Sequence, residues 1–399
     1  MTLRTLEDLG DVAGRRVFVR LDANVPLDGG RVADDMRIRA TIPTLNELLE
    51  RGCSLVLASH LGRPKGQPVD DLRLAPVADL LAELLGRDVM ALDEVTGPDV
   101  EAATNHLEPG EVVLLENLRF DPGEEANDPG FAGRLAELAD AYVDDAFGAV
   151  HRAHASVSAL PELLRASGRP AVAGRLLQGE VEVLGRLLEG PQEPYIAVLG
   201  GAKVSDKLGT IEALVDRVDA LLIGGAMAFT LIAAAGGEVG NSLVERDRLD
   251  EVRAATAKAA ARGVLLEVPQ DVVAAAEMKV DAVAKTVPAA DVPRSLMGLD
   301  IGPKTVEEYA RIIADAETIL WNGPMGVFEL APYAAGTRTV AQAIADSGAF
   351  TVVGGGDTGA AIRALGFDAG AFGHVSTGGG ASLEFIQGRT LPGLAALGT

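Results

Sequence analysis

Short, continuous apolar runs recur along this chain and alternate with segments whose apolar residues have helical spacing. The clearest runs lie at 15–21, 53–60, 111–118, 195–201, 219–225, 263–269, 317–323 and 349–355. Strands that have one face in water alternate apolar with polar residues, whereas continuous apolar runs between helices are typical of parallel strands buried on both faces. The pattern therefore predicts an α/β fold with parallel sheets.

The length of the chain and one helical segment indicate how these elements are divided. A chain of 399 residues is long enough for two domains, each with its own core. Between Leu176 and Leu188 apolar residues recur at helical spacing, and the sequence GPQEP then breaks the pattern. We therefore predict two α/β domains joined by an amphipathic helix.

Composition indicates a soluble, globular chain, with 48% hydrophobic and 23% charged residues. The segment 220–237 carries no charge, but its glycine pairs favour a buried strand, a turn and a buried helix over a membrane span. The N-terminal sequence MTLRTLEDLGDV lacks the basic and apolar regions of an export signal. The single cysteine, Cys53, lies in an apolar run, so we expect a cytoplasmic protein in a reducing compartment.

The charge balance limits the classes of partner. The formal net charge is −23, and only seven of the 35 basic residues are lysines. Such a surface opposes binding to nucleic acid or to an anionic membrane. A surplus of acid with little lysine also suggests a halophilic source.

The stretch FTVVGGGDTGAAIRAL, residues 350–365, is a candidate anion site. A β-branched run stops at three glycines, and Asp357 and Thr358 then open an alanine-rich segment, which predicts a strand, a glycine turn and a helix start. Free N–H groups and the helix dipole favour an anion there, and Asp357 offers an oxygen ligand for Mg²⁺. The alternative is an ordinary strand–helix connection with a Thr or Asp cap.

Other glycine loops and two lysines follow strands in the second half of the chain. In YIAVLGGAKVSDKLGTI, residues 195–211, Lys203 and Lys207 would share one face of a helix that starts there, and both could donate to phosphate oxygens. A solvated helix face is the alternative. In WNGPMGVFE, residues 321–329, Glu329 could hold ribose hydroxyls or could lie on the surface. A second three-glycine loop at 378–380 precedes another helix start.

Basic groups collect at predicted strand ends in the first half. His60, Arg63, Arg119 and Arg152 lie at or beyond such ends, where open α/β sheets bind ligands. Asp22 and Asn24 follow another strand, and Arg37 comes soon after. Each group alone would be an ordinary surface residue, but together, in so acidic a chain, they favour an anion site. A histidine metal site is disfavoured because no H-x-x-x-H or H-E-x-x-H spacing occurs.

Taken together, the sequence motifs resemble those of the phosphoglycerate kinase family along essentially the whole chain. The motifs are VRLDANVP, SHLGRP, LENLRF, DDAFGAVHRAHAS, LGGAKVSDK, GGAMAFT, DIGPKT, WNGPMGVFE, GGGDT and STGGGASLE. One departure is Ala23, where the family usually has an aromatic residue, and another is VPQDVVAAAE at 268–277. The first puts packing rather than chemistry in doubt.

The resemblance implies two doubly wound, Rossmann-like domains of parallel sheet. The implied division is 1–172 for a 3-phosphoglycerate-binding domain, 173–190 for the joining helix, 191–384 for a nucleotide-binding domain and 385–399 for a segment that packs back on the first domain. Expected partners are 3-phosphoglycerate or 1,3-bisphosphoglycerate and ADP or ATP with Mg²⁺, with no nucleic acid and no membrane. We expect a monomer.

The resemblance also assigns roles to residues at matching positions. Substrate would be bound by Asp22, Asn24, Arg37, His60, Arg63, Arg119 and Arg152. Nucleotide would be bound by Gly200, Gly201, Lys203, Lys207, Gly224, Gly225, Asn322, Val327, Glu329, Gly354, Gly355, Gly356, Asp357 and Thr358, with Asp357 on the metal. The transferring phosphoryl group would be stabilised by Arg37, Lys203, Lys207 and the loops at Gly356 and Gly379.

The implied reaction is reversible transfer of the 1-phosphoryl group of 1,3-bisphosphoglycerate to ADP, with hinge bending to bring the substrates together. A dinucleotide-dependent oxidoreductase would need G-x-G-x-x-G after the first strand, and that array is absent. A non-catalytic nucleotide-binding or interaction protein on the same fold is the remaining alternative. It would be expected to lose Arg37, Lys203, Lys207 or Asp357.

Overall fold

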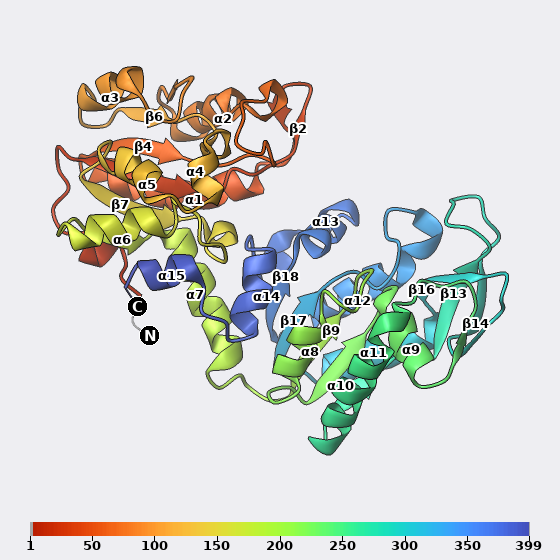
Figure 1. Ribbon diagram of the computed structural model, residues 1–399. Helices are drawn as coiled ribbons and strands as arrows, with labels where there is room; N and C mark the ends of the chain where they lie inside the picture. Colours follow the sequence, from red (N-terminus) through yellow and green to blue (C-terminus); the bar gives the residue numbers. More distant parts are fainter. Residues whose placement is uncertain (1–2, 399) are drawn as a thin grey trace. The chain divides into compact units, whose positions relative to one another are not determined.

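The computed structural model describes residues 3–398, which form two compact units (Figure 1). Unit 1 contains the described residues up to Glu182 and those from Thr390 on, and unit 2 runs from Val183 to Arg389. The boundary falls within α7 (Arg175–Leu188), which occupies the segment predicted to be an amphipathic helix. The predicted end positions 1 and 399 lie outside the described residues.

Unit 1 is built on a parallel sheet of six strands in the order β5-β6-β4-β1-β7-β8. The strands are β1 (Arg16–Leu21), β4 (Ser54–Ala58), β5 (Met90–Ala91), β6 (Val112–Leu114), β7 (Ala141–Asp145) and β8 (Ala171–Ala173). A short hairpin joins β2 (Leu27–Asp28) to β3 (Arg31–Val32). The central strands β1, β4 and β7 are buried except for Arg16 at the start of β1, as their continuous apolar runs predict.

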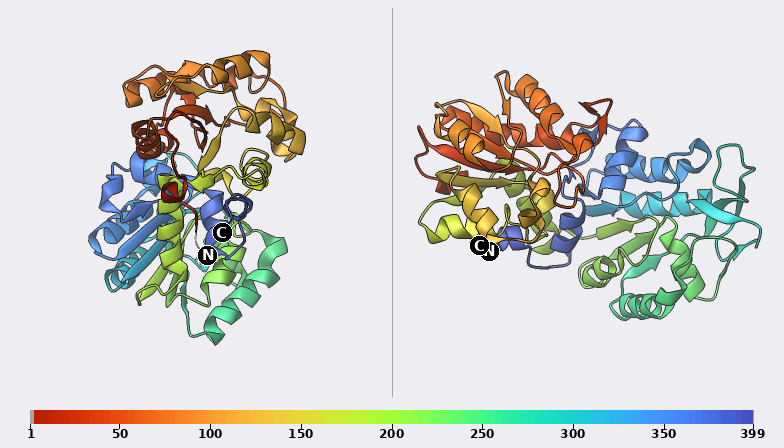
Figure 2. Two further views of the ribbon diagram at one scale, coloured as in Figure 1. Left: turned by 90° about the vertical axis from the view of Figure 1, so that its left-hand side faces the viewer. Right: turned by 45° about the horizontal axis from the view of Figure 1, so that its top comes forward.

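Helices cover both faces of this sheet (Figures 1 and 2). They are α1 (Met36–Glu50), α2 (Ala75–Leu85), α3 (Pro98–Asn105), α4 (Pro122–Glu125), α5 (Pro129–Ala136), α6 (Ala159–Ala166) and α15 (Pro392–Ala396), with 3₁₀ turns η1 (Leu6–Asp8), η2 (Asp70–Leu72), η3 (Leu118–Phe120) and η4 (Phe147–Ala149). The C-terminal α15 belongs to unit 1 because Gly393 N donates to Val150 O at 2.9 Å and Arg165 Nη1 donates to Ala396 O at 2.9 Å.

Unit 2 repeats the plan with a second parallel sheet, in the order β12-β10-β9-β17-β18-β19. Its strands are β9 (Tyr195–Leu199), β10 (Ala220–Ile223), β12 (Leu265–Glu267), β17 (Thr318–Asn322), β18 (Phe350–Gly354) and β19 (His374–Val375). Three further strands, β13 (Asp271–Ala275), β14 (Lys285–Pro288) and β16 (Met297–Ile301), form an antiparallel sheet, and β11 (Glu238–Val239) pairs with β15 (Asp291–Val292).

The helices of unit 2 connect these strands. They are α8 (Leu208–Leu214), α9 (Met227–Ala234), α10 (Leu249–Ala261), α11 (Pro303–Ala314), α12 (Ala335–Asp346), α13 (Gly356–Ala364) and α14 (Gly380–Ile386), with 3₁₀ turns η5 (Arg246–Arg248), η6 (Ala331–Tyr333) and η7 (Ala369–Ala371). The uncharged segment 220–237 forms β10, a turn and the buried α9, as predicted. Within residues 3–398, no helix combines the length and the hydropathy that a membrane crossing requires.

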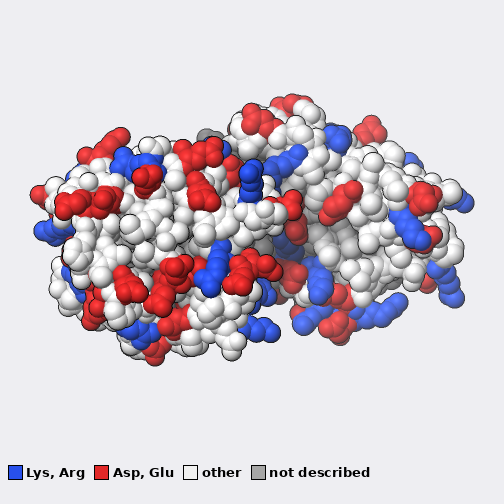
Figure 3. All heavy atoms as spheres, turned by 90° about the horizontal axis from the view of Figure 1, so that it is seen from above, with Lys and Arg blue, Asp and Glu red and all other residues white. Residues whose placement is uncertain are grey.

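Acidic side chains are spread over the face drawn in Figure 3 rather than gathered at one place. Basic side chains lie among them, and several form surface ion pairs within one turn of helix, such as Arg39 with Asp35 at 2.7 Å and Arg311 with Glu308 at 2.7 Å. Exposed pairs of this kind contribute little stability. On this face the excess of acid is therefore not confined to one patch.

Candidate active site

The sheet order of unit 1 brings the predicted substrate residues to one edge. Strands β6, β4, β1 and β7 are consecutive neighbours and all run parallel, so the loops that follow them leave the sheet on the same side. Arg119 follows β6, His60 and Arg63 follow β4, Asp22 and Asn24 follow β1, and Arg152 follows β7. The sequence does not establish these strand neighbours, whereas the pairing registers do.

Hydrogen bonds join several of these residues around the turn at Gly62. Asn24 Oδ1 accepts from Gly62 N at 3.0 Å, and Arg119 Nη1 donates to Gly62 O at 2.7 Å. Arg37, from α1, donates through Nη1 to Asn24 O at 2.9 Å and lies 3.5 Å from Asp22 Oδ2. Asn24 and Arg119 therefore hold this turn, and the partly exposed Arg37 joins Asn24 to Asp22.

His60 is buried, and its ring is held by a residue that the sequence analysis overlooked. Arg20 Nη2 lies 3.0 Å from His60 Nδ1, and Arg20 Nε donates to Ser156 Oγ at 2.9 Å. Ser156 in turn donates to the buried Glu124 at 2.6 Å. Burial and the positive charge of Arg20 hold the pKa of His60 well below its usual range, so the imidazole is neutral. The available signal was an arginine inside the buried part of β1, where its neighbours are apolar.

The two remaining predicted residues, Arg63 and Arg152, are exposed. Arg152 Nε bonds to His151 Nε2 at 3.0 Å, and its charge contributes, after burial and the charges of Arg119 and Arg20, to lowering the pKa of His154 to about 4. Arg152 thus belongs to the same cluster of positive charge as Arg119. Arg63 comes directly after Gly62 but points to solvent. A concentration of guanidinium groups at one sheet edge is suited to phosphate and carboxylate.

In unit 2, glycine loops follow β9 and β10 and pack against the loop after β17. Gly201 N donates to Pro324 O at 3.1 Å, and Gly225 N donates to Met325 O at 2.9 Å. A Cβ atom on Gly200 would lie 2.1 Å from Pro324 O, and one on Gly225 would lie 2.5 Å from Gly201 N. Only glycine permits such an approach of backbones, whereas Gly224 mainly faces the side chain of Met325.

The expectation that Lys203 and Lys207 share a helix face is wrong. Helix α8 begins at Leu208, with Lys207 as its N-cap, and residues 204–207 form a turn. Glu245 fixes this turn, since its carboxylate accepts from Ser205 N at 3.0 Å and from Ser205 Oγ at 2.6 Å. Contacts from a distant segment thus decide the local backbone.

The two lysines lie in different environments. Lys203 is exposed, whereas Lys207 is largely enclosed and donates to Asn322 Oδ1 at the end of β17. Burial lowers the pKa of Lys207 to about 8, against the opposing effects of Asp206 and Asp357. Asp357 is therefore near enough to Lys207 for their charges to interact, and Lys207 itself contacts Asn322.

The GGGDT stretch forms the predicted strand, turn and helix. Gly354 ends β18, Gly355 has φ +90°, and α13 begins at Gly356, so the N–H groups of the first turn are free of strand pairing. Thr358 Oγ1 accepts from Gly323 N at 2.7 Å and donates to Gly354 O at 2.7 Å, which joins this loop to the loop after β17. The second three-glycine loop has Gly379 at φ +54° immediately before α14.

Asp357 is the predicted metal ligand, and its carboxylate is exposed at the first turn of α13. Across residues 3–398, no group of three or more His, Cys, Asp or Glu side chains is arranged to hold a metal by itself. A single carboxylate fits Mg²⁺ of the kind that takes its other ligands from nucleotide phosphates and water.

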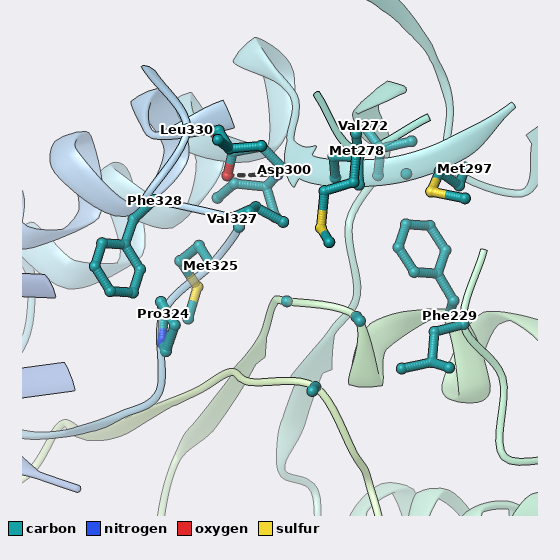
Figure 4. Close-up of a pocket in the computed structure, with 18 of the residues that line it drawn as sticks. Phe229, Val272, Met278, Met297, Asp300, Pro324, Met325, Val327, Phe328 and Leu330 are labelled. Carbon is teal, nitrogen blue, oxygen red and sulfur yellow. Dashed lines mark hydrogen bonds between the residues drawn. The ribbon is translucent and has the colours of Figure 1, made fainter. Parts of the chain in front are cut away.

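A cavity of about 960 Å³ opens beside these loops. Gly201, Gly225, Val327, Glu329 and Asp357 contribute to its lining, so one cavity unites residues from four of the predicted nucleotide loops. Figure 4 shows Pro324, Met325, Val327, Phe328 and Leu330 along one wall and Phe229, Met278 and Met297 at the other end. The walls are largely apolar, which suits the flat face of a nucleobase.

Comparison with known proteins gives one consistent result. The family model described as phosphoglycerate kinase matches residues 6–389. The phosphoglycerate kinases of Salinispora tropica and Thermomicrobium roseum are 55% and 53% identical to this chain, over 100% and 99% of both sequences respectively. The solved structure of phosphoglycerate kinase from Coxiella burnetii superposes with a TM-score of 0.88 at 41% identity, and covers 99% of both chains.

That superposition confirms the predicted fold class, two parallel-sheet α/β domains. The solved phosphoglycerate kinase from Pyrococcus horikoshii agrees, with a TM-score of 0.86 at 34% identity over 99% of this chain and 98% of that one. Family, relatives and solved structures each span nearly the whole chain. The chain belongs to the phosphoglycerate kinase family.

Proposed function

We propose that this chain catalyses the reversible transfer of the 1-phosphoryl group of 1,3-bisphosphoglycerate to ADP, giving 3-phosphoglycerate and ATP. The observation that carries the proposal is that, in a chain of this family, both sheet edges retain every polar residue that the resemblance requires. The alternative of a non-catalytic binding protein on the same fold has no comparable support, because Arg37, Lys203, Lys207 and Asp357 are all present.

The edge of unit 1 would bind the phosphoglycerate. Asp22 and Asn24 accept hydrogen bonds and would contact the hydroxyl and carboxyl end of the substrate, while Arg37, Arg63, Arg119 and Arg152 would bind its phosphate and carboxylate oxygens. His60 would contribute as a neutral imidazole, since its pKa is held far below neutrality. The contact of Arg119 with Gly62 and that of Arg37 with Asn24 support this assignment.

The edge of unit 2 would bind the nucleotide. The base would lie in the cavity beside Gly200, Gly201, Gly224, Gly225 and Val327, with Glu329 near the ribose. Lys207 and Asn322 would contact the phosphates, and the N–H groups at Gly354–Thr358 would bind the terminal phosphate. Asp357 would hold Mg²⁺, which when bound neutralises charge on the nucleotide phosphates.

Phosphoryl transfer from an acyl phosphate requires positioning and charge stabilisation rather than acid catalysis. The leaving group of an acyl phosphate is a carboxylate, so it needs no strong proton donor. The oxygens of the transferring phosphoryl group would be stabilised by Arg37, Lys203 and Lys207, with N–H groups at Gly356 and Gly379. Lys203 is exposed, whereas Lys207 is held by Asn322.

In-line transfer requires the two substrates to come into contact, and each is assigned to a different unit. We therefore propose hinge bending at the 176–188 helix and its flanks when both substrates bind. Small-angle scattering would detect it as compaction with 3-phosphoglycerate and nucleotide together. An unchanged radius of gyration would contradict hinge bending.

Several further properties belong to this proposal. A net charge of −23 with few lysines supports adaptation to high salt and argues against nucleic acid as a partner. A single buried cysteine supports a reducing, cytoplasmic location. We propose that the protein acts there as a monomer on small-molecule substrates.

The test is a coupled assay with 3-phosphoglycerate and Mg-ATP, in dilute buffer and in molar KCl. Turnover in either buffer would support the kinase activity, and turnover in KCl alone would also support halophilic adaptation. Folded protein that turns over in neither, yet binds Mg-ADP, would favour the non-catalytic alternative. Circular dichroism and the melting temperature in both buffers establish that the protein is folded.

A further inference from the structure

Asp300 is a buried carboxylate that lines the proposed nucleotide cavity, and none of the roles above uses it. It lies on β16, is 3% exposed, and contributes to the same cavity as Gly225 and Val327. Figure 4 shows it beside Val327 and Leu330. A carboxylate in a mostly apolar wall is costly unless its oxygens are satisfied, so its partners are informative.

Strand β16 contains a bulge next to this residue. In the pairing with β13, Val273 is opposite Asp300 while Ala274 is opposite Gly298, so Leu299 is an extra residue. The backbone carbonyl of Leu299 accepts from Val327 N at 2.9 Å. The bulge thus directs the strand toward the loop at residues 323–330, which we call the base loop because it carries Val327 and Glu329.

The carboxylate of Asp300 extends this attachment to helix α12. Its Oδ1 accepts from Ile301 N at 2.9 Å, and its Oδ2 accepts from Gly336 N at 2.7 Å in the first turn of α12. The next residue, Thr337, accepts through Oγ1 from Met325 N at 3.0 Å and from Gly326 N at 3.3 Å. Strand, helix end and base loop therefore form one chain of hydrogen bonds.

The backbone fits closely around this carboxylate. A Cβ atom on Gly326 would lie 2.2 Å from Asp300 Oδ1, and one on Gly336 would lie 2.3 Å from it. Burial raises the pKa of Asp300 to about 7, and the N–H groups of Gly336 and Ile301 oppose that shift. The two backbone N–H contacts hold the side chain of Asp300 at a fixed point between the base loop and α12.

We propose that Asp300 is a positioning residue for the nucleotide, which ties α12 to β16 and so fixes the base loop against the glycine loops. The inference rests on the proposed function, in which the base lies between these two sets of loops. Asp300 is not required to touch the nucleotide. Its loss should loosen the wall at Val327 and Glu329 and weaken nucleotide binding, and it should leave the phosphoglycerate residues of unit 1 unaffected.

The decisive variant is Asp300→Asn, which keeps the size of the side chain but replaces one acceptor with an NH₂ group facing an N–H donor. The matched control is Asp271→Asn. Asp271 is also buried in unit 2 and accepts from Lys304 N at 3.2 Å and Thr305 N at 2.9 Å, at the start of α11. The control removes the same kind of helix-end contact without touching the base loop.

Mg-ADP affinity is measured by titration calorimetry, and KM for ATP and for 3-phosphoglycerate by the coupled assay. We expect Asp300→Asn to raise the Kd of Mg-ADP and the KM of ATP on the order of tenfold, with KM for 3-phosphoglycerate unchanged within about twofold. Asp271→Asn should lower the melting temperature without raising the Kd. Unchanged Kd in Asp300→Asn, or an equal rise in both variants, overturns the proposal.

A second pair keeps the proposal testable if Asp300→Asn does not fold. Thr337→Val removes the hydroxyl that accepts from Met325 and Gly326, and Thr337→Ser retains it. Thr337→Val should weaken Mg-ADP binding, whereas Thr337→Ser should keep the affinity of the unsubstituted chain. Equal affinities in the two variants would overturn the proposal. An inactive wild-type chain that still binds Mg-ADP would refute the proposed function. Because calorimetry needs no turnover, the comparison of variants would still decide the role of Asp300.

Discussion

The burial of Lys207 predicts that nucleotide binding depends on pH. Its ammonium group is largely enclosed beside Asn322, and burial lowers its pKa from 10.5 to about 8. Below pH 8 the lysine of the free enzyme is charged and can bind phosphate oxygens, and above pH 8 it is progressively neutral. Since kcat/KM reports ionisations of the free enzyme, kcat/KM for Mg-ADP should fall as the pH rises through 8.

The magnitude follows from the position of that pKa. One pH unit above it, about a tenth of the lysine remains charged, so kcat/KM at pH 9 should be about tenfold below its plateau. A hydrogen bond to a charged group contributes about 1.5–3 kcal/mol, so Lys207→Met should lower kcat/KM about 10- to 150-fold at pH 7 and remove the decline above pH 8.

The assay is the initial rate with limiting Mg-ADP from pH 6 to 10, with 1,3-bisphosphoglycerate saturating. Lys207→Arg keeps its charge over this range, so its profile should stay level above pH 8. The matched control is Lys258→Met, which removes a surface lysine paired with Asp216 and should leave the profile unchanged. A wild-type profile that is level to pH 10, or a decline that persists in Lys207→Arg, would refute the reasoning.

Three further predictions concern other features. Lys203→Ala should lower kcat roughly 10²–10⁴-fold with the melting temperature unchanged, and a loss of only a few fold would contradict its role on the transferring group. Gly225 has φ +64°, and a Cβ atom there would lie 2.5 Å from Gly201 N, whereas Gly236 has φ +93° but open space around it. Gly225→Ala should therefore raise KM for ADP much more than Gly236→Ala. Equal effects would point to backbone strain rather than to the close contact between the loops. Burial raises the pKa of Asp145 from 3.8 to about 7, so between these pH values the folded chain binds a proton that the unfolded chain does not. The free energy of unfolding should therefore fall by at most about 4 kcal/mol as the pH rises from 4 to 7. Denaturant unfolding should show that this slope is reduced in Asp145→Asn, and an unchanged slope would contradict the assignment.

The sequence by itself determined the strands, the joining helix and the residues at the strand ends. A strand buried on both faces needs a continuous apolar run, and runs such as 195–201 and 349–355 admit few other structures. The glycines at 354–356 likewise indicate a tight turn before a helix, because few residues tolerate the backbone of Gly355 at φ +90°. Strands and turns of this kind depend on residues that are neighbours in the sequence, so the sequence alone predicts them.

Only the tertiary structure decided which of these residues meet. The order β6-β4-β1-β7 brings Arg119, His60, Asn24 and Arg152 to one edge, and strand order depends on packing between segments far apart in the chain. Arg20 binds His60 from within an apolar strand, Glu245 turns the Lys203 segment away from a helix, and Asp300 reaches α12 through a bulge. Each of these contacts joins residues that are at least about 36 positions apart, so they depend on tertiary packing and not on neighbouring residues in the sequence.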